Sequence, residues 1–418
     1  MEHVLVTGAA GMIGRATTNH LRSLGHAVTA LVLDDPGDLK VDRVVVGNAG
    51  DRAAVEEALD GVEAVIHLAA IPAPVLGTAN EVFAGNTAAT FTVLDAAGQR
   101  GIRRAAIASS INALGYGWSP LRRPCPEYLP LDEDLPTQAA DPYSLSKVAD
   151  EATAAAMHRR YGMTVVALRL PFVGSLSTDD GGDGRLPAHA AAVTANAEVG
   201  ARDLWLYLET RDAARAMEHA LRVSEAGAHV AFVAAPRSIA PYSTEDLLDL
   251  YYPDVPRRRP MPGRTAPVDL TQAERILDFT AIHLLPDSDE VRTLPAGLRT
   301  EEDVMTVTRT TPDSRTAETT QVLAADAPAF ENVKPPWEPR DGLRITGVRA
   351  IATAPGGTPL VIVRVDTNEP GLYGLGCATF TQRWHSVVAY VEQHLERLVV
   401  GRHPADIEDI IRAVHYGS

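Results

Sequence analysis

The start of the chain constrains its fold more than any other stretch. Residues 4–6 form a short apolar run typical of a buried strand, and a helical pattern follows up to Leu24. Between them lie glycines at three-residue spacing, which let the backbone turn sharply and approach a diphosphate, while the helix start offers unpaired N–H groups. A glycine triplet between a strand and a helix predicts dinucleotide binding. The residues expected to take part are Gly8, Gly11, Met12, Ile13 and Gly14.

Strand-like and helical segments then alternate along the chain. The expected strands cover residues 28–33, 44–48, 64–70 and 104–108, and the expected helices cover 51–59 and 86–100. Alternation of this kind requires right-handed crossovers between parallel strands. We therefore expect an α/β fold with a Rossmann-type doubly wound parallel sheet.

Polar residues follow several of these strands, at the edge where open parallel sheets bind ligands. Asp34 follows the second strand, where an acid can hold the adenosine ribose, and the strand tip carries no arginine for a 2′-phosphate. This favours NAD, although the usual acid position is Val32 and the residues leave NADP open. Asn48, at the end of the third strand, is placed to meet the adenine. His67, within the fourth strand, is expected to be a packed strand residue and not a catalyst.

One pair of side chains carries a specific chemical signal. Tyr143 and Lys147 lie four residues apart where an Ala-rich helical segment begins, so they share a helical face. Lys147 is one of only three lysines among 38 basic residues. An ammonium beside a phenol favours the phenolate and lowers the pKa of a phenol from about 10. We expect Tyr143 to exchange protons near neutral pH, with Ser110 placed for chemistry beyond the fifth strand.

Composition argues against several classes of protein. A formal charge of −16 disfavours a nucleic-acid or anionic-membrane partner, because either needs a basic face. The two cysteines, Cys125 and Cys377, are too few for a disulfide framework or a metal site of the CxxC kind, and no metal is expected. No apolar run reaches the length of a membrane span, and no signal peptide precedes the first strand. These features predict a cytoplasmic protein.

Taken in order, the motifs of residues 1–285 resemble the extended short-chain dehydrogenase/reductases of the NAD-dependent epimerase/dehydratase kind. The likeness rests on T-G-A-A-G-M-I-G at 7–14, H-L-A-A at 67–70, Asn86, S-S-I-N-A-L-G at 109–115, Y-S-L-S-K at 143–147, L-R-L-P-F-V-G at 168–174 and R-D-A-A-R-A at 211–216. The resemblance implies that Tyr143 is the catalytic acid/base, that Lys147 binds the nicotinamide ribose and tunes the phenol, and that Ser110 hydrogen-bonds the reacting oxygen. It also implies cofactor contacts from Leu68, Ala69, Ala70, Asn86 and Pro171, besides Tyr143 and Lys147.

One departure from the family pattern bears on the reaction. The dehydratases of the family carry an Asp-Glu pair directly after the serine position, where this chain has Ile111 and Asn112. Simple hydride transfer or epimerisation therefore fits better than 4,6-dehydration, and Asn112 resembles the substrate-binding amide of uronate dehydrogenases. Residues 172–285 form the expected small substrate region. Its Gly/Asp-rich loop at 175–186 either closes over substrate or is disordered, and Arg185 in this loop is a candidate clamp for a carboxylate or phosphate.

The chain changes character after residue 285. Residues 286–340 are rich in Thr, Asp, Pro and Ala with little periodicity, which predicts a largely irregular linker. Order returns in residues 341–418, where three strand-like runs precede two helical stretches and predict a small α+β module. The expected strands are 344–354, 358–366 and 373–379, and the expected helices are 385–399 and 404–415.

This C-terminal module resembles the N-terminal capping domain of the enolase superfamily, closest to its mannonate dehydratase-like branch. The likeness rests on R-I-T-G-V-R at 344–349, A-P-G-G-T at 354–358 and Y-G-L-G-C-A-T-F-T-Q-R at 373–383. It stops where that family continues into a barrel holding the metal-binding carboxylates and catalytic bases, so the module alone is expected to bind no magnesium and to catalyse nothing. Either the chain is a fragment of a longer bifunctional protein, or the module serves packing or oligomerisation.

Three functional hypotheses follow. The first is an NAD(P)-dependent oxidoreductase or epimerase acting on a hydroxyl or hemiacetal of a sugar, sugar acid or sugar nucleotide, with the short substrate region favouring a small sugar. The second is a nucleotide-binding scaffold without turnover, against which the intact set of Ser110, Tyr143 and Lys147 argues. The third is a dehydrogenase fused to a truncated sugar-acid dehydratase. Dimers are common in the families that the chain resembles, so a homodimer is compatible with the sequence.

Overall fold

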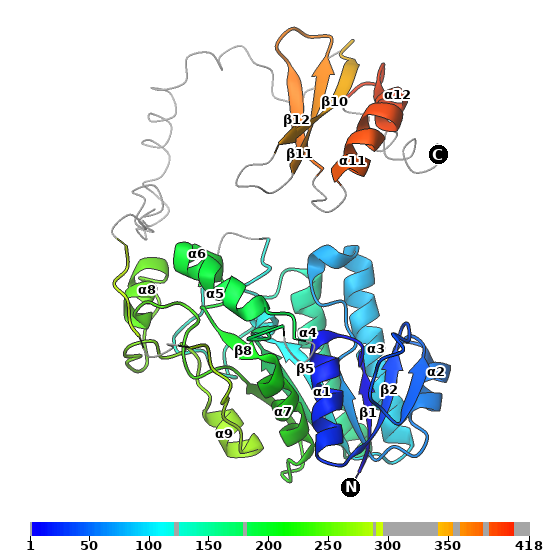
Figure 1. The fold of residues 1–418 in the computed structure, drawn as a ribbon, viewed down its shortest axis with the longest axis vertical. Helices are drawn as coiled ribbons and strands as arrows, with labels where there is room; N and C mark the ends of the chain where they lie inside the picture. The colour runs from blue at the N-terminus through cyan, green and yellow to red at the C-terminus, as the bar shows by residue number, and fades with distance from the viewer. Residues whose placement is uncertain are drawn as a thin grey trace. The chain divides into compact units, whose positions relative to one another are not determined.

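A parallel sheet, seven-stranded in the described part of the chain, forms the centre of the first of two units (Figure 1). The first unit runs to Met305 and the second begins at Thr306. The computed structural model describes residues 2–120, 125–178, 182–286, 290–295, 342–353, 360–378 and 384–404. The strands lie in the order β3-β2-β1-β4-β5-β6-β9. The chain therefore builds the sheet outward from β1 in one direction and then, from β4 on, in the other. The predicted Rossmann-type doubly wound sheet is therefore confirmed.

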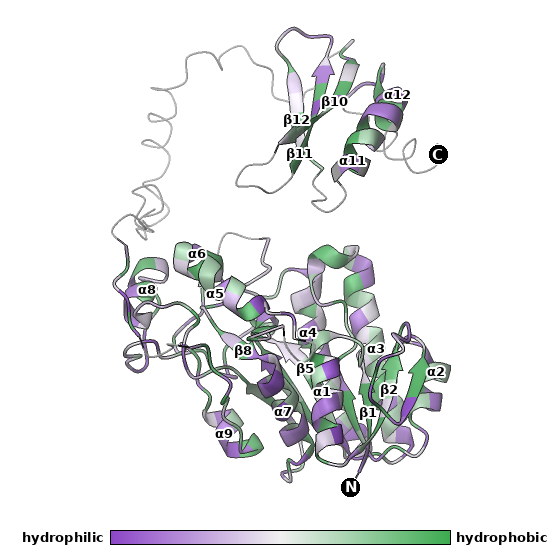
Figure 2. Cartoon of the chain, in the orientation of Figure 1, coloured by the Kyte–Doolittle hydropathy of each residue, from purple (hydrophilic) through white to green (hydrophobic). Residues whose placement is uncertain are grey.

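Alternation along the strands divides the core of this unit into two layers. The strands are β1 (His3–Thr7), β2 (Ala27–Val32), β3 (Arg43–Val46), β4 (Ala64–His67), β5 (Arg104–Ser110), β6 (Thr164–Leu170) and β9 (Ala228–Phe232). Val4 and Val6 of β1 belong to one buried cluster and Leu5 to the other, as expected for successive side chains on opposite faces. Figure 2 shows the resulting apolar strands in green. A sheet buried on both faces needs helices on both sides.

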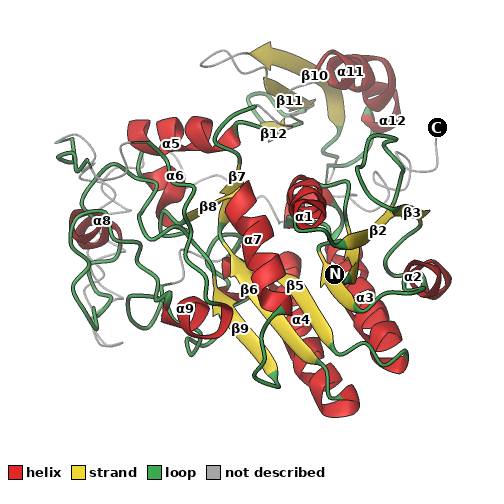
Figure 3. Cartoon of the chain, turned by 60° about the horizontal axis from the view of Figure 1, so that its bottom comes forward, coloured by secondary structure: helices red, strands yellow, loops and turns green. Residues whose placement is uncertain are grey.

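Helices cover the two faces of this sheet (Figure 3). On one face lie α1 (Met12–Ser23) and α7 (Thr210–Leu221), and on the other lie α2 (Arg52–Ala58), α3 (Ala79–Gln99) and α4 (Pro142–Tyr161). Most helices lie close to their predicted positions, but α3 begins seven residues before Asn86, where the sequence had placed its start. The reason is a capping box: the Thr78 hydroxyl accepts from the Glu81 N–H, while the Glu81 carboxylate accepts from the Thr78 N–H.

The segment after β6 contributes to two regions of the unit. It adds the strand β9 to the main sheet and the helix α7 to one face of that sheet. It also forms a smaller region around the buried Trp205, Tyr207 and Tyr252. The elements of this smaller region are β7 (Phe172–Gly174), β8 (Tyr207–Glu209), α5 (Arg185–Ala195), α6 (Glu198–Ala201), α8 (Thr244–Tyr251) and α9 (Thr271–Leu277). In the segment predicted as a linker, Arg292 forms an isolated parallel β-bridge with Tyr242. Residues 287–289 and 296–340 of this segment lie outside the described residues.

The second unit is a three-stranded antiparallel sheet with a helix packed on it. Its strands are β10 (Ile345–Thr353), β11 (Leu360–Thr367) and β12 (Tyr373–Cys377), in that order. The helical segment is α11 (Trp384–Tyr390), η7 (Val391–Leu395) and α12 (Glu396–Val399), and Val391 and Val399 bury against Ile345 and Val348. The predicted small α+β module is confirmed for these residues. The last predicted helix, 404–415, falls almost wholly outside the described residues.

No helix in the described part of the chain combines the length and the apolar character that a membrane crossing requires.

Two glycines of α3 give a test of how closely α3 and α4 pack. A Cβ on Gly98 would lie 2.3 Å from the Tyr161 ring, which the Asp95 carboxylate holds through the phenol, whereas a Cβ on Gly85 meets nothing closer than 3.9 Å. We expect Gly98→Ala to lower the free energy of unfolding by about 1–3 kcal/mol through overpacking. Gly85→Ala should raise it by up to about 1 kcal/mol through helix propensity. Urea unfolding of both variants measures the pair, and equal effects would contradict the close contact.

Candidate functional site

The turn between β1 and α1 has the geometry of a phosphate-binding loop. Gly8 has a φ of +66°, and a Cβ there would lie 2.8 Å from the Ala69 nitrogen at the end of β4. A Cβ on Gly14 would lie 2.2 Å from the Gly8 carbonyl oxygen, so α1 starts in direct contact with the turn. Gly11 is the N-cap of α1, and no side chain caps the helix. The first N–H groups of α1 and its positive dipole end can therefore meet an anion.

The other predicted cofactor residues lie along the same edge of the sheet. Asp34 is exposed two residues after β2, and Leu68, Ala69 and Ala70 directly follow β4. Asn48 follows β3, where its Oδ1 accepts from the Gly50 N–H at 2.8 Å. Pro171 joins β6 to β7. The glycine turn, the acid after β2 and these strand ends together fit a dinucleotide.

One contact near Asp34 was not predicted. The sequence shows no arginine at the tip of β2, but Arg15 from α1 reaches the loop after β2 and pairs with Asp38 at 2.9 Å. The Arg15 hydrogen bond is the main cause that lowers the pKa of Asp38. The guanidinium is thus already engaged by a carboxylate, which agrees with the preference for NAD over NADP.

Tyr143 and Lys147 are both buried near the start of α4. Asp141 caps this helix by accepting from the Ser144 N–H, and Pro142 occupies its first turn. The Lys147 ammonium lies 5.7 Å from the centre of the Tyr143 ring, donates to the Ala108 carbonyl at 2.9 Å and donates to Asp150 at 3.1 Å. Burial disfavours the charged ammonium, but Asp150 and then Tyr143 outweigh it and raise the pKa of Lys147. The site therefore holds a fixed positive charge beside the phenol.

Ser110 lies at the end of β5, two residues beyond the carbonyl that Lys147 binds. Side chains two apart on a strand share a face, so Ser110 points to the same side of the sheet as Ala108. Its Oγ accepts from the Asn112 N–H at 3.1 Å, which leaves the hydroxyl proton to donate elsewhere. The structure thus gathers Ser110, Tyr143 and Lys147 around the C-terminal end of β5.

A buried ion pair fixes the strand ends around these residues. Glu151, on α4, accepts two hydrogen bonds from Arg169 of β6, both at 2.9 Å, and one from the Ser109 hydroxyl at 2.6 Å. Both charged side chains are almost fully buried. Because breaking such a pair leaves a buried charge without compensation, α4, β5 and β6 are held in one relative position.

The sequence also matches known proteins. Residues 4–235 match the NAD dependent epimerase/dehydratase family. The chain belongs to this family. A short-chain dehydrogenase/reductase superfamily protein from Agrobacterium tumefaciens, solved with bound NAD, is 26% identical, with a TM-score of 0.50 over 68% of this chain and 93% of that one. UDP-glucose 4-epimerase from Brucella ovis, in complex with NAD, has the same fold at 22% identity, with a TM-score of 0.52 over 69% of this chain and 96% of that one.

A different group of relatives matches the C-terminal segment. A D-galactonate dehydratase family member from Catenulispora acidiphila is 66% identical over 90 residues, which is 22% of this chain and 21% of that protein. A second, from Pantoea ananatis, is 57% identical over 68 residues, or 16% of each. The chain spans about a fifth of the length of the curated relatives it matches. These matches fit the resemblance of this segment to the enolase superfamily.

In this epimerase/dehydratase family member, the Asn86 side chain forms three hydrogen bonds, to Ile71 and Ser146. Its Oδ1 accepts from the Ile71 N–H at 2.7 Å, and its amide hydrogens go to the Ile71 carbonyl and the Ser146 hydroxyl, both at 3.1 Å. The side chain therefore ties the loop after β4 to α4. Asn86, which the family resemblance implied as a cofactor contact, thus makes its hydrogen bonds to the loop after β4 and to α4.

Asn112 and Arg185, the two candidate substrate residues, lie on different elements. Asn112, in the short helix η2 (Ile111–Leu114), accepts from the Gly117 N–H at 3.0 Å, so its amide hydrogens remain as donors. Arg185, at the start of α5, donates to the Val173 carbonyl at 2.8 Å, contacts the Met12 sulfur and pairs with Asp183. Arg185 is thus placed beside the glycine turn.

A carboxyl group that sequence analysis missed adjoins Asn112. A Cβ on Gly117 would lie 2.3 Å from Asn112 Oδ1 and 2.5 Å from Asp203 Oδ1, so the two oxygens close over this glycine. Asp203 precedes Leu204 and Trp205, two residues with positive φ (50° and 54°), and its Oδ1 is buried with no hydrogen-bond partner in the described residues. Burial raises the pKa of Asp203 from 3.8 to about 6, although Arg202 works against this. The sequence offers no signal for this contact.

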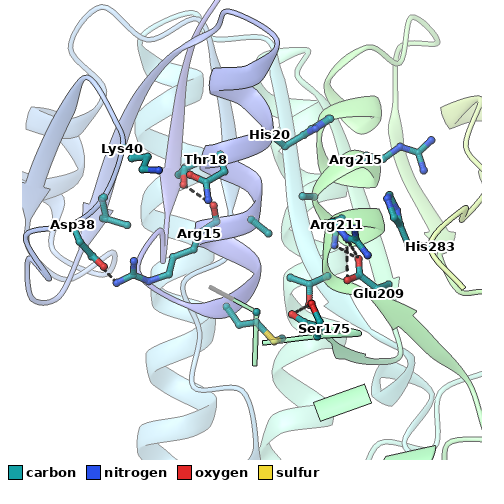
Figure 4. Close-up of a pocket in the computed structure, with 18 residues that line it drawn as sticks. Arg15, Thr18, His20, Asp38, Lys40, Ser175, Glu209, Arg211, Arg215 and His283 are labelled. Atoms are coloured by element: carbon teal, nitrogen blue, oxygen red, sulfur yellow. Dashed lines mark hydrogen bonds and ion pairs between the residues drawn. The ribbon is translucent and has the colours of Figure 1, made fainter. Parts of the chain in front are cut away.

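A separate pocket of about 620 Å³ opens between α1 and α7 (Figure 4). It begins at Met12 and Arg15 in the first turn of α1 and extends to His20 and His283. Three arginines line it, and each is paired with a carboxylate: Arg15 with Asp38, Arg211 with Glu209 and Arg215 with Asp212. Neither Ser110, Tyr143 nor Lys147 lines this pocket. The pocket therefore lies apart from the predicted catalytic residues.

The raised pKa of Asp203 predicts the pH dependence of stability. Between pH 3.8 and about 6 the folded protein keeps a proton that the unfolded chain loses, so the free energy of unfolding falls as the pH rises through this range. Asp203→Asn removes this cost and should stabilise the protein near neutral pH by up to roughly 3 kcal/mol. At pH values below the ordinary pKa the gain should vanish. Urea unfolding of both proteins across this range measures it, and a pH-independent difference would contradict the assignment.

Proposed function

We propose that the first unit binds NAD and catalyses proton-coupled hydride transfer at a hydroxyl-bearing carbon of a sugar-like substrate, as a dehydrogenase or an epimerase. The observation that carries the proposal is the buried Tyr143–Lys147 pair, whose ammonium binds the carbonyl of Ala108, two residues before Ser110 on β5. Membership of the epimerase/dehydratase family supports it. A binding scaffold without turnover would need neither the phenol nor the ammonium.

The residues that would hold NAD are those of the sheet edge described above. Gly8, Gly11 and Gly14 would admit the diphosphate to the start of α1, and Asp34 would accept from the adenosine ribose. An ammonium has three N–H donors, and Lys147 uses two of them on Ala108 and Asp150, so one remains for the nicotinamide ribose. Bound NAD would supply the hydride acceptor. The related protein from Agrobacterium tumefaciens with bound NAD supports this choice of cofactor.

The catalytic work of the chain would be proton transfer and orientation. Tyr143, as the phenolate, would take the proton from the substrate hydroxyl, and the Lys147 charge would stabilise that phenolate. The Ser110 hydroxyl, whose oxygen already accepts from Asn112, would donate to the same substrate oxygen and fix its position. Glu151 and Arg169 would keep these groups in place by holding α4 against β5 and β6.

A sugar acid or its aldehyde precursor is the substrate class that we favour. The Asn112 amide hydrogens and the Arg185 guanidinium are donors suited to hydroxyl and carboxylate oxygens. The D-galactonate dehydratase family relatives of the C-terminal segment support the same class. They also support a second candidate: a dehydrogenase joined to part of a sugar-acid dehydratase. In both cases we place the NAD-binding domain in residues 1–285, its substrate region mainly in 172–285, and the enolase-like module in 341–418.

Substitution of the phenol tests the catalytic proposal. We expect Tyr143→Phe to lower kcat by about 10²- to 10⁴-fold, because the general base is lost while the ring remains. The assay follows reduced nicotinamide with NAD and a panel of aldoses, uronates and sugar nucleotides, with a separate product assay for epimerisation. Tyr161→Phe on the same helix is the control and should keep full activity. Unaltered turnover in Tyr143→Phe would remove this residue from the mechanism.

A second substitution tests cofactor binding alone. Gly14→Val places a side chain against the Gly8 carbonyl and should weaken NAD binding by about 100-fold or more, because the turn must open to accommodate it. Calorimetric titration with NAD measures the affinity and needs no substrate. Gly85→Ala, a glycine replacement in open space on α3, is the control and should bind NAD as the native chain does. If folded Gly14→Val binds NAD normally, the turn is not the diphosphate site.

A further inference from the structure

A series of buried hydrogen bonds leads from the end of β4 toward Lys147. It starts at Thr7, whose Oγ1 accepts from the N–H groups of Leu68 and Ala69, both at 3.2 Å. Thr7 lies opposite His67 in the sheet, and its hydroxyl is 2.8 Å from His67 Nδ1. Because both lone pairs of the Thr7 hydroxyl are occupied, its proton is the one that joins it to His67.

His67 accepts a hydrogen bond on one ring nitrogen and donates one from the other. The imidazole is 4% exposed, and burial together with the Lys147 charge lowers the pKa of His67 to about 3, so the ring is neutral. Nδ1 accepts from Thr7, so the single ring proton lies on Nε2, which donates to the Thr90 hydroxyl at 3.1 Å. The Thr90 hydroxyl proton is then left to face Asp150, whose pKa Thr90 lowers.

Asp150 is where this series ends. Its carboxylate is fully buried on α4, and its Oδ2 accepts from the Lys147 ammonium at 3.1 Å. Its Oδ1 has no hydrogen-bond partner in the described residues. Burial raises the pKa of Asp150, while Lys147 and Thr90 act in the opposite direction. A carboxylate in this position needs both donors to remain charged.

We infer that Asp150 is a positioning residue that holds Lys147 in place and limits its field on Tyr143, and that Thr7, His67 and Thr90 orient Asp150. The inference rests on the proposed role of Tyr143. The Lys147 ammonium lies 5.7 Å from the centre of the phenol ring and contacts the Asp150 carboxylate directly at 3.1 Å. The negative charge of Asp150 therefore opposes part of the positive field that Lys147 exerts on the phenol.

The other charged groups around this pair are few and belong to different elements. On α4, Glu151 faces both Lys147 and Asp150. From β6, Arg169 neutralises Glu151 through its two hydrogen bonds. From β4, His67 is neutral. Asp150 is thus the carboxylate in direct contact with the ammonium, and its charge can be removed without disturbing the pair of Glu151 and Arg169.

Titration of the Tyr143 phenol tests the inference without substrate or cofactor. The near-ultraviolet absorbance of tyrosinate is followed against pH in the full chain. Each curve is compared with that of the same variant carrying Tyr143→Phe, so that the difference reports this tyrosine alone. In Asp150→Asn the ammonium is no longer opposed, so the Tyr143 step should move to lower pH by about one unit.

Two further variants separate the hydrogen-bond series from general damage to the site. Thr90→Val removes the donor to Asp150 and should move the Tyr143 step in the same direction, by less than Asp150→Asn. Thr90→Ser keeps the hydroxyl and should titrate as the native chain does. Glu218→Gln neutralises another buried carboxylate, paired with Arg222 on α7 across the sheet, and should leave the step unchanged.

The outcomes distinguish this inference from the proposed function. If the Tyr143 step moves down in Asp150→Asn and in Thr90→Val, Asp150 limits the field on the phenol, even if the native chain shows no turnover. If the step stays in place in folded Asp150→Asn, or if Thr90→Val and Thr90→Ser behave alike, the inference is wrong. The last comparison decides the question even if Asp150→Asn does not fold.

Discussion

The site depends on one buried charge, the Lys147 ammonium. A lysine with almost no exposure is costly unless its donors are satisfied, and here the Ala108 carbonyl and the Asp150 carboxylate satisfy two of them. The bond to Ala108 crosses from α4 to the end of β5, so the helix carrying Tyr143 is held against the strand carrying Ser110. Rotation of α4 or sliding along the sheet would leave the ammonium buried without partners. The position of the phenol is therefore set by the requirements of the lysine.

The glycine turn after β1 is joined to a buried polar layer beneath the site. Gly8 approaches the backbone after β4 so closely that a side chain would collide with it, and Thr7, one residue earlier, binds two N–H groups of the same backbone. From Thr7 the hydrogen bonds continue through His67 to Thr90 of α3. A displacement of the glycine turn would therefore disturb a buried polar layer that includes His67 and Thr90. Both ring nitrogens of His67 have their hydrogen-bond partners within this layer.

Local patterns in the sequence were sufficient for most of the fold. Apolar runs identified five of the seven strands described in the main sheet. The spacing of Tyr143 and Lys147 placed both residues on one helical face. The start of α3 was missed because the Thr78–Glu81 capping box lies before the periodic segment. Asp150 and Asp203 could not have been assigned in this way, since their environments come from residues far away in sequence, such as Thr90 and Gly117. Burial and partners of this kind are properties of tertiary structure.

The choice of lysine over arginine at position 147 has a physical reason. Arginine supplies all but three of the 38 basic residues, and it serves the ion pairs of this unit, including the buried one with Glu151. At position 147, however, the cation must meet a carbonyl and a carboxylate close to a phenol ring. A compact ammonium on a flexible stem can do this, whereas a planar guanidinium needs more space and directs its donors in a fixed fork. One of the three exceptions to the arginine preference therefore lies where a compact ammonium fits the geometry better than a guanidinium.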